Sequence, residues 1–174
     1  MHRKITSLLV AGLFMLPASV ALAQPQESAN GHGTLLVLND EGDAVRRQFS
    51  FSARREGDGS VKGQAVLHNP AFEGENGQPY QLKIAISCMH VVGNIAIFGG
   101  TVRRTNDPSL VDAVFFTVQD NGEPGRDRDK ISSVFFWDDD PNTTGDPQAC
   151  LATGANDFPF NTIESGNVQV KGAQ

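Results

Sequence analysis

The chain contains 174 residues, and its 20 acidic residues exceed its 14 lysines and arginines to give a formal net charge of −6. This length suits one domain of ordinary size with a single core. The acidic balance argues against a nucleic-acid partner or an anionic membrane surface, because both favour basic faces, and it leaves cations and neutral ligands open.

Residues 1–23 have the organisation of a signal peptide. A basic start, MHRK, is followed by the apolar stretch ITSLLVAGLFMLPASV and by the small residues ALA, so we expect cleavage before Gln24. The apolar stretch is too short to span a bilayer and no later stretch is apolar enough, so we predict no membrane span in the mature chain. Removing 23 of the 174 residues leaves 151, and the loss of Arg3 and Lys4 lowers the charge from −6 to −8. The expected location is the periplasm or the extracellular medium.

After a flexible N-terminal segment at 24–32, the sequence predicts a single β domain over 33–172. Apolar and polar residues alternate along its segments, and Gly, Pro, Asn and Asp cluster between them, as is typical of strands and turns. The predicted strands, in chain order, are GTLLVLN, QFSFSA, SVKGQAVL, YQLKIAISC, IAIFGGTVRR, AVFFTVQ, KISSVFFW and GNVQVK. No segment predicts a helix of more than a turn or two.

Alternation also assigns side chains to faces. Phe49, Phe51 and Ala53 share one face of their strand, and Ile84, Ile86 and Cys88 share one face of theirs. We therefore expect Cys88 in the same interior as these aliphatic and aromatic residues.

The joins between strands look like consecutive hairpins. Gly93 and Asn94, within VVGN, form the expected tight turn between two of them, and AVFFTVQ pairs with KISSVFFW through the connection DNGEPGRDRD. The closing strand, with Val168 and Val170 inward, meets GTLLVLN. The prediction is an all-β fold, a single antiparallel meander of about eight strands that is barrel-like or a sandwich. We favour barrel-like closure because it removes exposed edges, although the pattern alone does not separate the two.

Cys88 and Cys150 are the only two cysteines. In an exported chain a disulfide between them is expected, and by a chain-entropy model it would contribute about 4 kcal/mol. Two buried free thiols are the alternative.

Four segments together resemble a widespread bacterial β domain of exported and cell-surface proteins. They are QFSFSARREGDGSVKGQAVLHNP, VVGNIAIFGGTV, FFTVQDNGEPGRDRDKIS and SGNVQVK, and they occur in the same order over most of residues 31–172. That domain has no established biochemical activity. The resemblance therefore implies a fold and an exported location, and it implies no catalytic residue.

Acidic residues flank the aromatic run VFFW and raise the question of a cation site. In DDDPNTTGD the oxygens of Asp138, Asp140, Asn142 and Asp146 could surround calcium, which takes six to eight oxygen ligands. The segment is not an EF-hand loop, since Thr143 replaces the required glycine. The same residue types are selected by any exposed turn, which is the alternative for this segment. The acids of DNGEPGRDRD lie at the other end of the predicted hairpin and have competing arginines nearby.

Two further features suggest ligand binding. The pairs Arg46/Arg47, Arg54/Arg55 and Arg103/Arg104 could hold anionic groups, or could be charges at strand ends. Of the run Phe135, Phe136 and Trp137, at least one ring must leave the core; it could stack on a sugar or be covered by the loop NDFPFN.

His32, His68 and His90 are scattered, and no nucleophile or metal-protease motif is present. We therefore expect no enzyme and no cofactor. The leading hypothesis is an exported non-catalytic β domain with a structural, adhesive or ligand-binding role. A calcium- or carbohydrate-binding module is the alternative, and a hydrolase is the second alternative.

Overall fold

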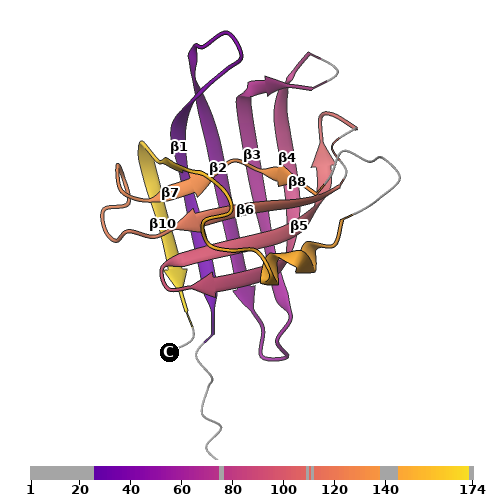
Figure 1. Ribbon diagram of the computed structural model, residues 1–174, viewed down its shortest axis with the longest axis vertical. Coiled ribbons are helices and arrows are strands. Elements are labelled where there is room, and N and C mark those ends of the chain that lie inside the picture. Colours follow the sequence, from indigo (N-terminus) through magenta and orange to yellow (C-terminus); the bar gives the residue numbers. More distant parts are fainter. Residues whose placement is uncertain (1–25, 75–76, 109, 111, 138–144, 173–174) are drawn as a thin grey trace, which may run out of the picture.

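The computed structural model describes residues 26–74, 77–108, 110, 112–137 and 145–172. These residues form ten strands and one short 3₁₀ helix, joined by turns and loops (Figure 1). The elements are β1 (Ser28–Leu38), β2 (Ala44–Arg55), β3 (Val61–Glu73), β4 (Pro79–Val92), β5 (Ile95–Thr105), β6 (Ala113–Gln119), β7 (Lys130–Ser132), β8 (Phe135–Phe136), η1 (Pro147–Leu151), β9 (Phe160–Thr162) and β10 (Ser165–Lys171).

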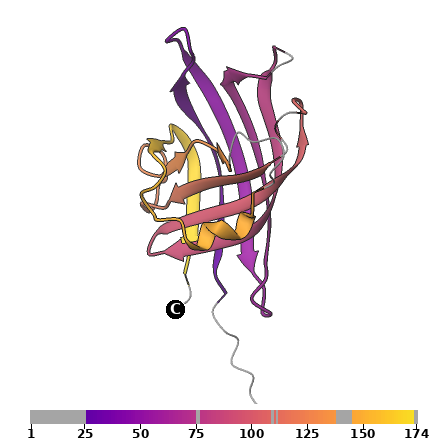
Figure 2. The same ribbon diagram turned by 45° about the vertical axis from the view of Figure 1, so that its right-hand side comes forward.

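The strands form one antiparallel sheet in the order β10-β1-β2-β3-β4-β5-β6-β7-β9, with β8 also paired to β6. The all-β prediction is confirmed, and so is the expected pairing of the first strand with the last. The preference for barrel closure is wrong, because the sheet is not closed into a barrel. Instead it folds over on itself, so that β5 and β6 cross the long strands β1–β4 (Figures 1 and 2).

Two sequence boundaries differ from the structure. Residues 28–32 lie in β1, not in a flexible segment, because their backbone pairs with β2 on one side and β10 on the other. The predicted strand KISSVFFW is two short strands, β7 and β8, both paired to β6. The two-residue turn Gly93–Asn94 joins β4 to β5 as expected.

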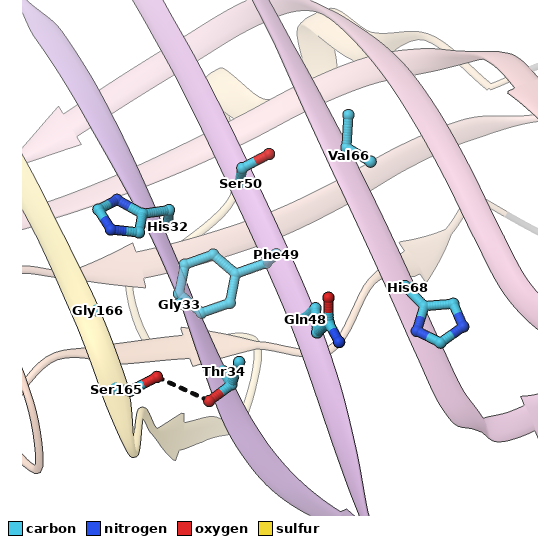
Figure 3. Close-up of a pocket in the computed structure, with 10 residues that line it drawn as sticks. All are labelled: His32, Gly33, Thr34, Gln48, Phe49, Ser50, Val66, His68, Ser165 and Gly166. Carbon is cyan, nitrogen blue, oxygen red and sulfur yellow. Dashed lines mark hydrogen bonds between the residues drawn. The ribbon is translucent and has the colours of Figure 1, made fainter.

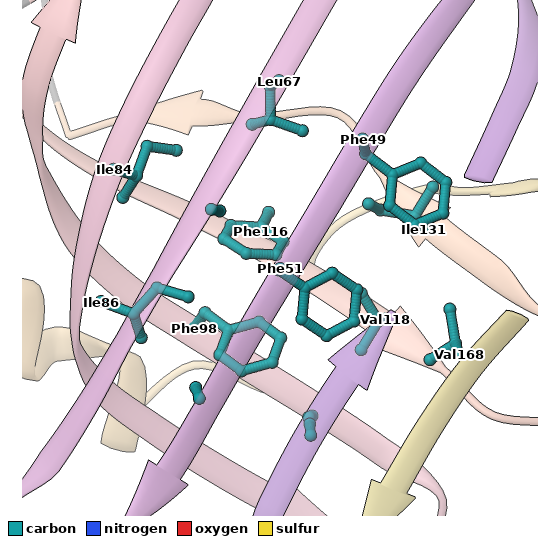
Figure 4. Packing of buried hydrophobic residues seen from close by; sticks show 14 of the residues in the cluster. Phe49, Phe51, Leu67, Ile84, Ile86, Phe98, Phe116, Val118, Ile131 and Val168 are labelled. Atoms are coloured by element: carbon teal, nitrogen blue, oxygen red, sulfur yellow. The ribbon is translucent and has the colours of Figure 1, made fainter. Parts of the chain in front are cut away.

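The main core lies between the two layers of the folded sheet. Its centre is a group of three rings: Phe51 of β2 lies 5.3 Å from Phe98 of β5 and 6.0 Å from Phe116 of β6, measured between ring centroids (Figure 4). Phe98 and Phe116 are 4.7 Å apart. Buried aromatic pairs at these distances add about 0.5–1.5 kcal/mol each to the burial of their area. The rings therefore join the long strands to the strands that cross them.

Two register shifts in the pairing of β4 with β5 change which side chains face this core. One lies between Lys83 and Ile84 and the other between Ile86 and Cys88. A bulge inserts a residue and reverses the inside-outside alternation beyond it. As a result Met89 continues the main core, and Cys88 enters a second buried cluster with Ile97 and Phe115. The prediction that Cys88 shares one interior with Ile84 and Ile86 is therefore wrong.

The second cluster lies on the outer side of β5 and β6 and is covered by η1. Cys150 of η1 is fully buried there and forms the expected disulfide with Cys88, with 6.2 Å between their Cα atoms. The helix approaches β5 closely at Gly99, where a Cβ atom would lie 2.0 Å from the carbonyl oxygen of Pro147. Glycine is required at this position because any side chain would displace η1.

Candidate functional site

The predicted cation site lies largely outside the described residues. Asp138, Asp140 and Asn142 belong to the segment that the structure does not describe. Asp146 is described, and its carboxylate caps η1 by accepting a hydrogen bond from the backbone N–H of Gln148 at 2.9 Å. Among the described residues, no three His, Cys, Asp or Glu side chains are grouped as metal ligands.

The acids of the other loop have a structural role. Asp129 is fully buried, and its Oδ2 accepts the backbone N–H of Val168 at 2.8 Å while its Oδ1 accepts that of Asn121. Asp120 accepts the backbone N–H of Val170 at 3.0 Å in the same way. The N–H groups of Val168 and Val170 belong to the edge of β10 that faces away from β1. The carboxylates thus satisfy donors that a neighbouring strand would otherwise satisfy.

The pair Arg46/Arg47 obeys the predicted alternation, with different outcomes for its two members. Arg46 is exposed on the outer face of β2, 3.7 Å from Glu164, and Arg47 is buried on the inner face with 1% of its surface exposed. Arg103 and Arg104 are both exposed. The interpretation of these residues as surface charges at strand ends is therefore wrong for Arg47.

The aromatic run Phe135–Trp137 was expected either to expose a ring or to be covered by the NDFPFN loop. The structure shows this cover for one of its rings. Phe135 stacks on Phe158 of the NDFPFN loop, with ring centroids 4.4 Å apart. Trp137 packs against Phe115 at 5.8 Å and still exposes 47% of its surface. One ring of the run is covered, and another remains accessible.

The clearest candidate site is a depression on the outer face of the long strands, away from β5 and β6 (Figure 3). It is open to solvent and has a volume of about 450 Å³. The residues that line it come from β10, β1, β2 and β3: His32, Gly33, Thr34, Gln48, Phe49, Ser50, Val66, His68, Ser165 and Gly166. Most of its polar groups are uncharged hydrogen-bonding side chains.

Strand register explains how distant residues meet at this outer-face depression. In one cross-strand row the direct neighbours are His32, Ser50, Val66, Lys83 and Arg104. A second, adjacent row contains Ser165, Thr34, Gln48, His68 and Gln81. Directly paired residues point to the same face of an antiparallel sheet, so all the side chains of one row lie on the same face. Neither row contains an acidic residue, although the chain as a whole is acidic.

Glycines open the floor of the depression. Gly33 pairs with Gly166, and a Cβ atom on Gly166 would lie 2.0 Å from the carbonyl oxygen of His32. The ring of Phe49 packs against Gly33 on the inner side of the sheet, where a Cβ atom on Gly33 would be 3.1 Å from Cζ, and the exposed side chain of Val66 supplies apolar surface to the depression. Thr34 and Ser165 join the two strands beside the glycines through a hydroxyl–hydroxyl hydrogen bond of 2.9 Å. The depression therefore combines an apolar floor with a polar rim.

Sequence reasoning missed this site. His68 alternates with the inward Leu67 and was predictable as an outward residue, but His32 was assigned to a flexible segment. Only the register of β1 with β2 and of β2 with β3 places the two histidines on either side of β2, His32 opposite Ser50 and His68 opposite Gln48 (Figure 3).

No helix among the described residues has the length and apolar character needed to cross a membrane. No protein-family model matches the chain. Searches of curated proteins and of solved structures find no significant match either.

Proposed function

We propose that the chain is an exported, non-catalytic β domain that binds carbohydrate in the outer-face depression. The observation that carries this proposal is the depression itself, in which uncharged hydrogen-bonding side chains from four strands surround an apolar floor. The signal-peptide pattern of residues 1–23 and the Cys88–Cys150 disulfide support the exported location.

The chemistry of the rim suits sugar hydroxyls. Imidazole, amide and hydroxyl groups can each donate and accept hydrogen bonds, and His32, Gln48 and Ser50 offer one of each within neighbouring strands. The apolar floor formed by Val66 and the glycines suits the C–H face of a sugar ring. Because the depression is open, a longer sugar chain could continue across the sheet from both ends of the site.

The charges beside the depression favour an anionic sugar. Lys83 and Arg104 are direct cross-strand neighbours, both exposed, at the end of the row that contains Val66. Neither forms an ion pair with a described residue. Like charges placed directly opposite each other destabilise a sheet, and a bound carboxylate or sulfate would relieve that repulsion. Acidic glycans are therefore the proposed ligand class.

Titration of the isotope-labelled domain with uronic-acid and neutral oligosaccharides tests the proposal. We expect the acidic sugars to shift the backbone resonances of β1–β3 around the depression. Gln48→Ala should weaken binding by about 2- to 10-fold, the effect of one lost hydrogen bond.

The sheet supplies a matched control. Gln64 is an outward residue of β3 paired with Ser52, and neither lines the depression. Gln64→Ala should leave the affinity unchanged. Equal losses for Gln48→Ala and Gln64→Ala, or resonance shifts confined to other strands, would contradict a ligand in the depression.

A further inference from the structure

Arg47 is a charged side chain among the apolar residues that β2 points into the core. The inward residues that follow it along β2 are Phe49, Phe51 and Ala53, and Leu35, its direct neighbour on β1, is fully buried. Arg47 itself exposes 1% of its surface. A strand position of this kind normally holds an aliphatic or aromatic residue.

The guanidinium of Arg47 has no hydrogen-bond partner among the described residues. Its Nε, Nη1 and Nη2 atoms are all buried, and none makes a hydrogen bond. None of the ion pairs among the described residues involves it. Burial lowers the pKa of Arg47 to about 10, so the group still carries its positive charge at neutral pH.

Arg55, on the same strand, shows how this chain satisfies a guanidinium. Its Nε donates to Glu27 at 2.8 Å, its Nη2 donates to the carbonyl oxygen of Met89 at 2.7 Å, and its Nη1 donates to that of Gly59 at 3.1 Å. All three nitrogens have acceptors. The contrast shows that the isolation of Arg47 is not a general feature of this sheet.

Proteins pair buried charges, because an unpaired buried ion is strongly unfavourable. Arg47 lies two residues before Phe49 along β2, on the side of the β1–β2 turn. An acceptor for its guanidinium must therefore come from outside the described residues.

We propose that Arg47 is the receptor of an interior anion site, which takes an oxyanion of carboxylate or sulfate size. The planar guanidinium presents two parallel N–H donors to such a group. The site is separate from the outer-face depression, because Arg47 points to the opposite face of β2 from Gln48 and Ser50. It is therefore independent of the proposed carbohydrate binding.

Thermal unfolding at pH 7 and constant ionic strength, in chloride with increasing acetate or sulfate, tests the proposal. Binding to the folded state alone should raise the Tm of the wild-type domain by about 5–10 °C at 100 times the dissociation constant. Arg47→Met removes the charge and keeps an apolar side chain of similar length. We expect this variant to show only the general salt effect on folded proteins.

Arg55→Met is the matched control, since it removes a guanidinium that already has acceptors. It should retain the anion-dependent rise in Tm. Loss of that rise in both variants, or its persistence in Arg47→Met, would overturn the proposal.

Two further measurements distinguish a free anion from other outcomes. In the ¹⁵N-labelled wild-type domain, the Arg47 Nε–H resonance, assigned by its absence in Arg47→Lys, should shift on titration with acetate. An unmoved resonance would contradict anion binding even if Arg47→Met failed to fold. A variant carrying Asp138→Asn, Asp139→Asn and Asp140→Asn, all outside the described residues, should keep the full anion response. If those substitutions destabilise the wild type but not Arg47→Met, the counter-charge comes from the chain itself and the proposal is wrong.

Discussion

The carboxylate of Asp129 accepts the backbone N–H of Val168 across 39 positions of sequence, at 2.8 Å and in a fully buried environment. Through this bond the loop between β6 and β7 occupies the place of a neighbouring strand at the edge of β10. The sheet does not close into a barrel, so no strand pairs with this edge of β10. The acidic DNGEPGRDRD loop covers it instead.

Replacement of Asp129 by alanine should destabilise the domain by about 2–4 kcal/mol. The change leaves the buried N–H groups of Val168 and Asn121 without an acceptor, and each unsatisfied group costs about 1–3 kcal/mol. Urea denaturation followed by tryptophan fluorescence measures the loss. Asp40→Ala, at an exposed residue of the β1–β2 turn, is the control and should change stability by less than about 0.5 kcal/mol. Equal effects would show that Asp129 does not support the edge.

Replacement of Gly99 by alanine should displace η1 from β5. The added Cβ atom would lie 2.0 Å from the carbonyl oxygen of Pro147 and 3.2 Å from Cβ of Cys150. Overpacking of this kind typically costs about 1–3 kcal/mol. Gly57→Ala, where no atom lies within 4 Å of the new Cβ, should have little effect. The midpoints of thermal unfolding compare the two variants, and a Gly99→Ala midpoint equal to that of Gly57→Ala would refute the close contact.

Calcium should leave the thermal midpoint unchanged if DDDPNTTGD is only an exposed turn, which is our expectation. Asp146 already accepts a hydrogen bond as the cap of η1, so Asp146→Ala should lower stability by about 1 kcal/mol in calcium and in chelator alike. Unfolding in 1 mM calcium is compared with unfolding in excess chelator. A higher midpoint in calcium that Asp146→Ala abolishes would instead support the predicted site at Asp138, Asp140, Asn142 and Asp146.

The stability difference between Arg47→Met and the wild type should depend on pH in buffers without oxyanions. Burial lowers the pKa of Arg47 from its ordinary, higher value in the unfolded chain to about 10 in the fold, so the folded state loses this proton first. The charged group therefore destabilises the wild type fully well below pH 10, by roughly 3 kcal/mol, and progressively less as the pH rises above 10.

Denaturant titrations at pH 8, 9, 10 and 11 measure this dependence. Arg47→Met should be the more stable protein at pH 8, and its advantage should shrink by pH 11. Taking the difference between the two proteins removes the contribution of other groups that titrate in this range. An advantage that is constant or grows with pH would contradict a buried unpaired charge at Arg47.

The sequence by itself determined that the domain is built from antiparallel strands, where the turn at Gly93–Asn94 lies and which residues of β2 point inward. These features are local, because side chains alternate along any strand and only certain residues fit tight turns. The meeting of the closing strand with the first was also predictable from the hairpin sequence, and β1 does pair with β10.

Tertiary structure alone decided the rest. One bulge between Ile86 and Cys88 moves the disulfide into a second cluster, although the alternation of β4 predicts a single interior. The two histidines of the depression belong to strands on either side of β2, and the acceptors on Asp129 and Asp120 face a strand about 40 to 50 positions away. Alternation specifies the face of a residue but contains no information on register, bulges or the edge that a loop covers. Those depend on long-range contacts, and they place both the outer-face depression and the buried Arg47.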